Sequence, residues 1–191
     1  MQIVLIRHGV SLMNEANTPE YKICSGQYDS PLTSKGIEQA KKLNGDPLLA
    51  DVDAIYSSDL YRCKQTCSYI FPDREAVYDA RLRERYLGEF EGKYIQDLAA
   101  KAEYKKYFTD PEFMGYRHSF KVSAPGGESY KDVENRVRSF LDEVLETGAK
   151  KIVIISHTHT MRCILKVLKD LSEEETLKLK INNCEPVIVE K

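Results

Sequence analysis

The sequence has no long hydrophobic run, no excess of basic residues and no acidic tail. Its 191 residues carry a formal net charge of only −2, although 30% of them are charged. Without a basic excess we expect no nucleic-acid partner, and without an acidic tail no disordered segment. No apolar run approaches membrane-spanning length, and the first residues lack the charged and apolar regions of a signal peptide. We therefore expect a cytoplasmic protein that has no membrane partner.

Cysteine is also scarce, and its spacing matches no paired motif. The five cysteines are Cys24, Cys63, Cys67, Cys163 and Cys184. An odd set without CxxC spacing favours reduced thiols over a disulfide framework. Two of them, Cys63 and Cys67, stand four residues apart in a segment of helical period, so we expect them to be small buried residues.

What the chain does have is an alternation of short apolar runs with longer segments of helical period. Its length suits one domain, residues 1–191, with a sizeable core. Strands are predicted at Gln2–Ile6, Asp53–Tyr56, Ala76–Tyr78, Lys151–Ile155 and Val187–Val189. Helices are predicted after Thr33, after Ser57 or Ser58, from Ser129, over Met161–Leu168 and around Ser172–Lys180. The alternation predicts a three-layer α/β/α sandwich with a mostly parallel sheet, whose last strand is an edge because Pro186 removes a ladder donor.

One stretch, about 94–123, does not fit this alternation and is predicted to be an irregular, lid-like insertion over the sheet. It is rich in tyrosine and lysine. Its tyrosines either line a pocket or pack the lid: Tyr94, Tyr104, Tyr107 and Tyr116. Three basic residues, Arg117, His118 and Lys121, either contact substrate or are solvated on the lid.

Arginine and histidine follow the ends of several predicted strands. Arg7 and His8 follow the first strand, Arg62 lies about one helical turn beyond the second, and His157 follows "KIVIIS". Open α/β sheets bind ligands at the carboxyl ends of their strands. If these strands are neighbours, two arginines and two histidines meet at one edge of the sheet.

Such a cluster suits phosphate, because a guanidinium group pairs bidentately with its oxygens. A histidine among arginines resists protonation, and a neutral imidazole is a nucleophile. Gly9 is expected to let the backbone approach a phosphoryl group closely. The leaving oxygen also needs a proton donor, and "RLRERYLGEFEG" contains three candidates: Glu84, Glu89 and Glu91.

A metal site is the alternative for the second histidine, because His157 and His159 have the HxH spacing of metal ligands. A metallohydrolase would need carboxylates or further histidines beside them. The chain has four histidines, of which His8 is assigned to the strand end and His118 lies in the insertion. We therefore expect no metal and no cofactor, and we interpret His159 as a helix-start or packing residue.

Six blocks of sequence occur in an order that resembles a known family. They are "LIRHG", "SGQYDSPLTSKGIEQA", "IYSSDLYRCKQT", "RLRERYLGEFEG", "PGGES" and "IISH". Together they are similar to the histidine phosphatase superfamily, in its phosphoglycerate mutase-like branch. The resemblance covers most of the chain and leaves out the 94–123 region and the last helix. Five or more spaced blocks are far more specific than a lone "RHG".

The resemblance implies roles for individual residues. His8 is expected to be the nucleophile that becomes a phosphohistidine, with Arg7, Arg62 and His157 as the phosphate pocket. Glu84 is expected to be the proton donor, while Glu89 and Glu91 are turn and surface charges. Secondary phosphate contacts are expected from Asn14 and from the backbone around Gly26. The family usually has glycine where this chain has Thr158, so the pocket is expected to be narrower there.

The expected activity is hydrolysis of a phosphomonoester on a small metabolite, in two steps and without metal. A cofactor-dependent phosphoglycerate mutase is the alternative, because it shares every catalytic residue; the compact chain favours hydrolysis. A binder of phosphorylated ligands is a third possibility, although it would need neither His8 nor Glu84. The substrate, the oligomeric state and the role of the insertion stay open.

Overall fold

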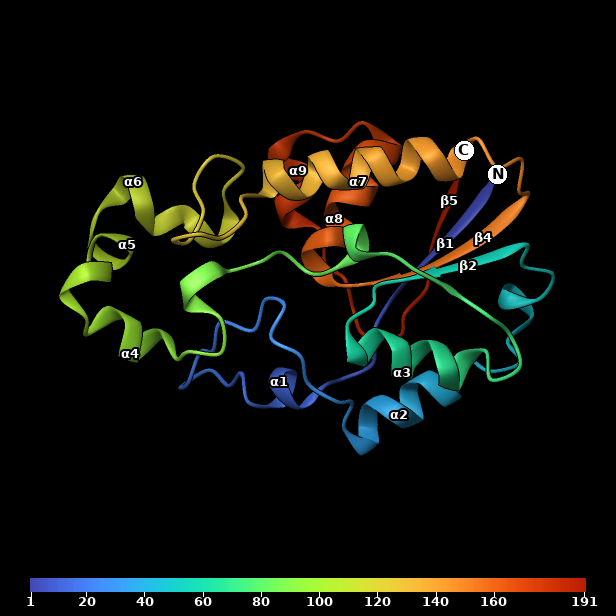
Figure 1. Cartoon of the computed structure of the whole chain (residues 1–191), viewed down its shortest axis with the longest axis horizontal. Helices are drawn as coiled ribbons and strands as arrows, with labels where there is room; N and C mark the ends of the chain where they lie inside the picture. Colours follow the sequence, from blue (N-terminus) through green and yellow to red (C-terminus); the bar gives the residue numbers. More distant parts are fainter.

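The computed structural model, which describes residues 1–191, contains a five-stranded sheet that lies between two layers of helices, in the right-hand half of Figure 1. Its strands are β1 (Gln2–Arg7), β2 (Ala54–Ser57), β3 (Val77–Tyr78), β4 (Lys151–Ser156) and β5 (Val187–Glu190). Their order across the sheet is β3-β2-β4-β1-β5. The first four are parallel to their neighbours, and β5 is antiparallel to β1 at one edge. The predicted mostly parallel sheet with a final edge strand is confirmed.

Helices cover both faces of the sheet, as predicted (Figure 1). One face carries α2 (Ser34–Lys41) and α3 (Tyr61–Ile70), and the other carries α7 (Tyr130–Leu145), α8 (Thr158–Lys169) and α9 (Glu173–Lys178). The alternation of strand side chains explains this arrangement. Ile3 and Leu5 join the core under α7 and α8, whereas Val4 and Ile6 join the core under α2 and α3. A single short turn, α1 (Leu12–Glu15), follows β1.

The starts of the helices show where local sequence signals decide the structure. Thr33 caps α2 by accepting from the amide of Gly36, and Ser129 caps α7 in the same way, both as predicted. Ser57 and Ser58 do not cap α3; its first flanking residue is Leu60, which makes no side-chain cap. The hydroxyl of Ser58 is instead in contact with the functional site described below.

Helix α8 begins at Thr158, three residues before the predicted start at Met161. The apolar period begins only at Met161, because Thr158 and His159 of the first turn line the cavity and Thr160 is a buried polar residue. Periodicity detects the buried face of a helix and misses a first turn of this kind. Short 3₁₀ turns complete the framework at Pro47–Leu49, Ala80–Leu82 and Gly88–Phe90.

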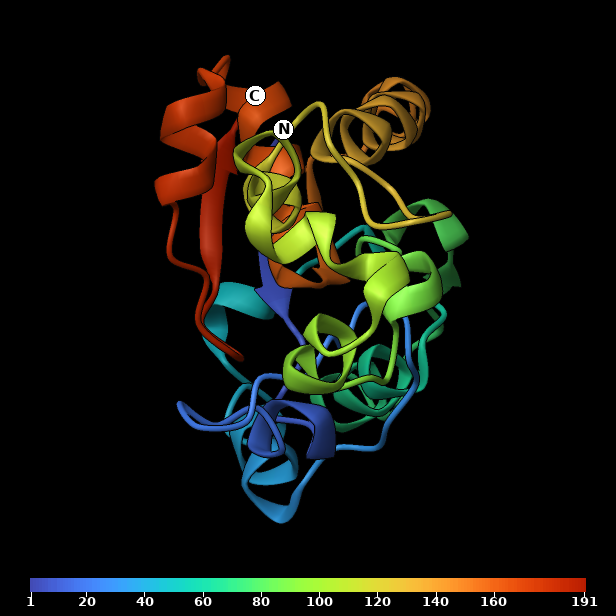
Figure 2. The same ribbon diagram turned by 90° about the vertical axis from the view of Figure 1, so that its left-hand side faces the viewer.

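The 94–123 region, called the lid below, consists of short helices rather than irregular chain (Figure 2). They are α4 (Ile95–Ala99), α5 (Lys106–Thr109) and α6 (Pro111–Met114), with 3₁₀ turns at Ala102–Tyr104 and Gly115–His118. Helices of four or five residues are too short for a periodic pattern to predict. Three of the lid tyrosines pack edge-on against Phe90: Tyr104, Tyr107 and Tyr116. These tyrosines therefore pack the lid, while Tyr94 is exposed.

Candidate active site

The predicted convergence of strand ends occurs, because β4 lies between β1 and β2. Arg7 at the end of β1 is in register with Ser156 at the end of β4. The amide of His8 then donates to the carbonyl of Ser156 at 3.1 Å. The rings of His8 and His157 lie 5.0 Å apart between centroids and are tilted by 59°.

A cavity of about 170 Å³ opens at this edge of the sheet. Seven of the predicted site residues line it: Arg7, His8, Asn14, Gly26, Arg62, Glu84 and Thr158. The other lining residues include Arg117, for which the sequence left substrate contact open, His159, which was expected only to start or pack a helix, and three that the sequence did not mark: Ser11, Asn17 and Ser25. His157 is the one predicted site residue that does not line the cavity.

His8 is held in one orientation and one tautomer. Its Nδ1 lies 2.7 Å from the carbonyl oxygen of Gly9. A carbonyl only accepts, so Nδ1 carries the hydrogen and Nε2 carries the lone pair. Burial, followed by the charges of Arg62 and Arg7, lowers the pKa of His8 well below its usual value. The imidazole is therefore neutral at physiological pH and nucleophilic at Nε2.

Gly9 meets a packing requirement that the sequence did not reveal. A Cβ at this position would lie 2.4 Å from the carbonyl oxygen of Gly36 in α2. The amide of Gly9 donates to Thr66 Oγ1 in α3 at 3.0 Å. The glycine thus lets the turn after β1 pack tightly against both helices, which holds the neighbouring His8 in place.

Arg62 is a buried site residue and not a surface arginine, with only 4% of it exposed. Its Nη1 and Nη2 donate to the carbonyls of Tyr28 and Gly26, at 3.0 and 2.9 Å. Its Nε donates to Nδ1 of His157 at 3.2 Å. The nearest carboxylate, on Asp29, is 3.8 Å away. Arg62 therefore orders the 26–29 loop and brings a positive charge to the cavity.

His157 lies behind Arg62 and is fully buried. Its Nδ1 accepts from Arg62, and its Nε2 lies 2.9 Å from Ser58 Oγ. Burial and the charge of Arg62 lower its pKa well below the usual value, so the ring is neutral. We predicted a direct contact between His157 and the phosphoryl group; in this structure both ring nitrogens are engaged with the protein. His157 instead holds the Arg62 guanidinium and the Ser58 hydroxyl in position.

The segment before β5 supports the end of β1. Arg7 donates through Nη1 to the carbonyl of Ile181 at 2.9 Å, and its buried Nε has no partner. The side-chain amide of Asn183 donates to the carbonyl of His8 at 2.6 Å, and the backbone amide of Cys184 donates to the carbonyl of Arg7 at 2.9 Å. Sequence reasoning missed Asn183, because nothing in "INNCEP" marks it as a neighbour of the first strand.

Glu84 is the carboxylate of the cavity. Its Oε1 accepts from the amides of Arg85 and His159, at 2.9 and 3.1 Å. Its Oε2 lies 3.1 Å from Nδ1 of His159. Burial alone would raise the pKa of Glu84, but the neighbouring His159 and the hydrogen bond from the Arg85 amide outweigh burial and hold that pKa well below its usual value. The carboxyl group is therefore ionised in the empty cavity.

The other two glutamates have structural contacts. Glu89 accepts from the hydroxyl of Tyr104 in the lid at 2.6 Å. Glu91 is half-buried and accepts from the amides of Gln27 and Leu87, at 2.6 and 3.0 Å. The interpretation of Glu91 as a surface charge is thus wrong, because it holds the loop that contains Gly26. That glycine has a φ of +47°, and a Cβ there would meet Glu91 Oε1 at 2.2 Å.

The lid reaches the cavity through one basic side chain. Arg117 lines the cavity, whereas His118 and Lys121 do not. Arg85 fixes this part of the lid, since its guanidinium donates to the carbonyls of Tyr116 and Arg117, each at 2.9 Å. Arg85 itself is buried, with 2% exposed. Of the three basic lid residues left open above, the structure places Arg117 alone at the site.

His157 and His159 face different partners despite their HxH spacing. The first contacts Arg62 and Ser58, and the second contacts Glu84. No three histidine, cysteine, aspartate or glutamate side chains come together as a group that would hold a metal ion.

All five cysteines are free, and Cys63 and Cys67 are buried as predicted. No helix is long and apolar enough to cross a membrane.

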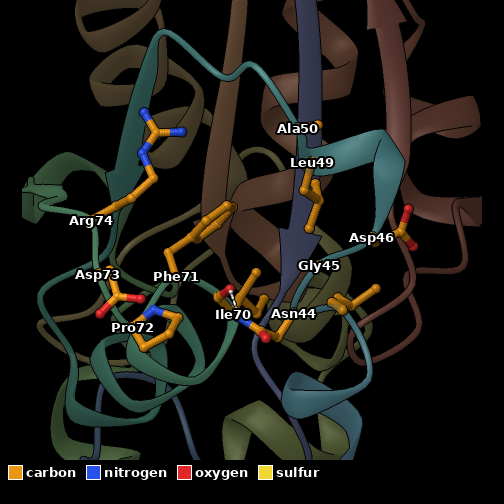
Figure 3. Close-up of a pocket in the computed structure, with 11 residues that line it drawn as sticks. Asn44, Gly45, Asp46, Leu49, Ala50, Ile70, Phe71, Pro72, Asp73 and Arg74 are labelled. Atoms are coloured by element: carbon orange, nitrogen blue, oxygen red, sulfur yellow. Dashed lines mark hydrogen bonds between the residues drawn. The ribbon is translucent and has the colours of Figure 1, made fainter.

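A second hollow, of about 240 Å³, lies at the opposite, amino end of β2 (Figure 3). Three of its polar side chains form hydrogen bonds with nearby backbone. Asn44 donates to the carbonyl of Ile70, Arg74 donates to that of Val52, and Asp46 caps the 3₁₀ turn that follows it. This hollow offers no reactive group, so the chemistry belongs to the cavity at the carboxyl edge.

The fold and this cavity define an α/β protein with histidine and arginine side chains gathered at the carboxyl edge of a mostly parallel sheet. The model of the histidine phosphatase superfamily (branch 1) matches residues 3–191. The chain belongs to this superfamily, as its motifs predicted.

Relatives carry different activities in their names. A 2,3-bisphosphoglycerate-dependent phosphoglycerate mutase of Gloeobacter violaceus is 32% identical, over 98% of this chain and 84% of its own. The α-ribazole phosphatase of Shigella flexneri has a similar structure, with a TM-score of 0.82 at 23% identity, over 100% of this chain and 90% of that one. A mycobacterial glucosyl-3-phosphoglycerate phosphatase follows with a TM-score of 0.80 at 22% identity, over 98% and 88%. At these identities the two structures show the shared fold.

Proposed function

We propose that the protein is a metal-independent phosphatase of one domain that hydrolyses a small phosphomonoester through a phosphohistidine at His8. The observation that carries the proposal is the state of His8. It is neutral, its hydrogen is on Nδ1, and it lines a cavity that also contains three arginines and one carboxylate. A nucleophile, positive charge for the phosphoryl oxygens and an acid–base group are the parts that such a reaction needs.

In the first step, the lone pair of His8 Nε2 attacks phosphorus in line with the leaving oxygen. Arg7 and Arg62 stabilise the phosphoryl oxygens, largely through position and electrostatics. Asn14, Thr158 and the backbone at Gly26 lie around the same cavity and complete the phosphate contacts. Glu84 gives a proton to the leaving alcohol as the P–O bond breaks.

In the second step, water attacks the phosphohistidine. Glu84, now a carboxylate, takes a proton from the water, and the electron pair of the P–N bond returns to Nε2 of His8. His157 acts through Arg62 in both steps, because it contacts that guanidinium and not the cavity. The arginines supply the positive charge that a metal supplies in other phosphatases.

A mutase remains the alternative, and the identity to the Gloeobacter mutase favours it. A mutase must return the phosphoryl group to its substrate before water reaches it. The lid of this chain is short, formed of helices of four or five residues, and it contributes one side chain to the cavity. A small lid of this kind supports water access and hence hydrolysis.

The deciding experiment is a panel of phosphomonoesters assayed beside a mutase assay primed with 2,3-bisphosphoglycerate. We expect phosphate release from at least one member of the panel and little mutase activity, both unchanged by EDTA. Dominant mutase activity would replace the proposal with the alternative. Loss of activity in EDTA that zinc or manganese restores would contradict metal independence.

Mass spectrometry after brief incubation with a labile phosphoester separates both enzymes from a binder of phosphorylated ligands. We expect a phosphorylated protein that loses the group at low pH, as a phosphohistidine does, and no modification in His8→Ala. An unmodified wild-type protein that still binds phosphate would support the binder. The cytoplasmic location and the absence of nucleic-acid and membrane partners stay predictions.

A further inference from the structure

We propose that His159 holds the proton that Glu84 donates and later receives, so that the two side chains act as one acid–base pair; this rests on the phosphohistidine mechanism above. His159 does not touch the reacting atoms in this scheme and acts through Glu84. It is therefore a positioning residue for the general acid.

The contacts between the two residues leave little freedom. The amide of His159 donates to Glu84 Oε1 at 3.1 Å, and its Nδ1 lies 3.1 Å from Oε2. This Nδ1 is buried, and its 3.1 Å approach to Oε2 is close enough for proton transfer although the pair is not aligned as a hydrogen bond in the empty site. The ring is fixed from the other side by Tyr130, whose ring stands edge-on to it at 5.4 Å between centroids. Tyr130 is in turn held by Arg162, which donates to its hydroxyl at 2.9 Å.

Glu84 needs such a partner because its surroundings favour the wrong state for the first step. Two amides and the imidazole stabilise the carboxylate, and its pKa is well below the usual value. A general acid must carry a proton when the leaving oxygen departs. A carboxyl group that is ionised in the empty site must therefore receive a proton from a neighbour or with the substrate, and His159 is the titratable group within hydrogen-bond distance.

The transfer balances in both steps. In the first, the proton on Nδ1 of a protonated His159 moves to Oε2 of Glu84, and Glu84 gives a proton to the leaving oxygen. The P–O bond breaks, and the bond between phosphorus and His8 Nε2 forms. In the second, a proton of the attacking water passes to Glu84 and on to Nδ1, which restores the starting pair.

The charges around His159 link its protonation to substrate binding. Burial, Arg85 and Arg162 lower the pKa of His159, while Glu84 raises it. His118 of the lid faces it as well, and Tyr130 faces it from α7. In the empty site the balance lies below the usual value, so the pair has lost its extra proton. A phosphate dianion in the cavity adds two negative charges and raises the pKa of His159, so binding and proton uptake occur together.

The kinetic test is His159→Asn. Asparagine keeps the backbone amide and a side-chain N–H that donates toward Oε2, but it takes up no proton. At pH 7 we expect single-turnover phosphorylation by an alkyl phosphate to slow about tenfold or more, while p-nitrophenyl phosphate changes about twofold at most, because a good leaving group needs no acid. The alkyl-phosphate rate of the variant should also begin to fall at a lower pH than that of the wild type. Lys121→Ala, which changes an exposed lid lysine outside the cavity, should preserve the wild-type profile.

A purely structural role would give a different result. Equal slowing with both substrates and an unshifted pH profile, or no slowing at all, would overturn the proposal. A wild-type protein that forms no phosphoenzyme would instead refute the proposed function, so the two failures are distinguishable.

A second measurement does not depend on turnover. In protein labelled with ¹⁵N-histidine, NMR titration of His159 should give a higher pKa with inorganic phosphate bound than without it. In Glu84→Gln, the pKa of His159 should fall in both conditions, because the carboxylate that raises it is gone. A His159 pKa that responds neither to phosphate nor to Glu84→Gln would contradict the acid–base pair.

Discussion

The strand-end site and the lid serve the same cavity but are built in different ways. At the strand ends, His8, Arg62 and His157 follow three neighbouring parallel strands and contact one another or their backbone directly. The lid is a set of short helices that pack around Phe90 and send Arg117 into the cavity. The first region contains the reactive groups, and the second contains most of the aromatic packing.

This difference indicates that the strand ends serve the chemical steps and that the lid serves substrate binding. Positions at strand ends are fixed by the sheet, in which β1 and β4 are buried on both faces, so His8 and the arginines keep their geometry without help from the lid. The lid is anchored by Arg85 and by the hydrogen bond from Tyr104 to Glu89. We therefore expect changes at the strand ends to abolish chemistry, and changes in the lid to alter binding.

The largest effect is expected from His8→Ala. Loss of the nucleophile removes the covalent step, so turnover and protein phosphorylation should both fall to background. The change lies in a turn at the end of β1, so circular dichroism should show a folded protein. A well-folded variant that hydrolyses phosphomonoesters near the wild-type rate would refute the phosphohistidine mechanism.

Glu84→Gln is expected to come next. Glutamine keeps the size and an acceptor oxygen but gives up no proton, so phosphorylation by alkyl phosphates should slow by about 10²–10⁴-fold and that by p-nitrophenyl phosphate much less. The phosphoenzyme should accumulate, because its hydrolysis needs the base. Glu89→Gln and Glu91→Gln are the matched controls, since a glutamine oxygen still accepts their hydrogen bonds. Leaving-group dependence in either control and not in Glu84→Gln would reassign the acid.

The two regions also differ in how far the sequence predicted them. Strand ends were predictable, because buried β-branched runs such as "KIVII" mark the strands and the residue after each run is then located. The contact between His159 and Glu84 was not predictable. It depends on how the loop after the 3₁₀ turn Ala80–Leu82 packs against the first turn of α8. His157 was placed at the correct edge, but its orientation toward Arg62 and away from the cavity is a matter of packing.

Arg62→Ala should reduce transition-state stabilisation by about 2–4 kcal/mol, the usual cost of losing one preorganised charged donor. The structure adds that this loss also frees the carbonyls of Gly26 and Tyr28 and one nitrogen of His157. Both kcat and KM should therefore change. Arg81→Ala, which breaks partly exposed ion pairs away from the cavity, is the control. An unchanged kcat/KM in Arg62→Ala would remove this residue from the site.

Phe90→Ala tests the lid. Phe90 is fully buried at the centre of the lid cluster, so truncation should reduce the free energy of unfolding by about 3–5 kcal/mol. Phe140→Ala removes a ring of equal size from the core under α7 and should destabilise the protein to a similar extent. At a temperature where both variants are folded, only Phe90→Ala should raise KM. Equal effects of the two variants on KM would show that the lid has no separate part in binding.

The smallest effect is expected from Arg117→Ala. Arg117 is half-buried and lines the cavity. An ion pair between such a partly exposed side chain and phosphate contributes about 1 kcal/mol. This corresponds to about a fivefold rise in KM, with kcat little changed, because the strand-end residues remain in place. Arg117→Lys should recover most of the loss, and Lys121→Ala, which changes an exposed lysine outside the cavity, should cause none. A fall in kcat as large as that of Arg62→Ala would place Arg117 among the catalytic residues. It would refute the hypothesis that the lid affects binding alone.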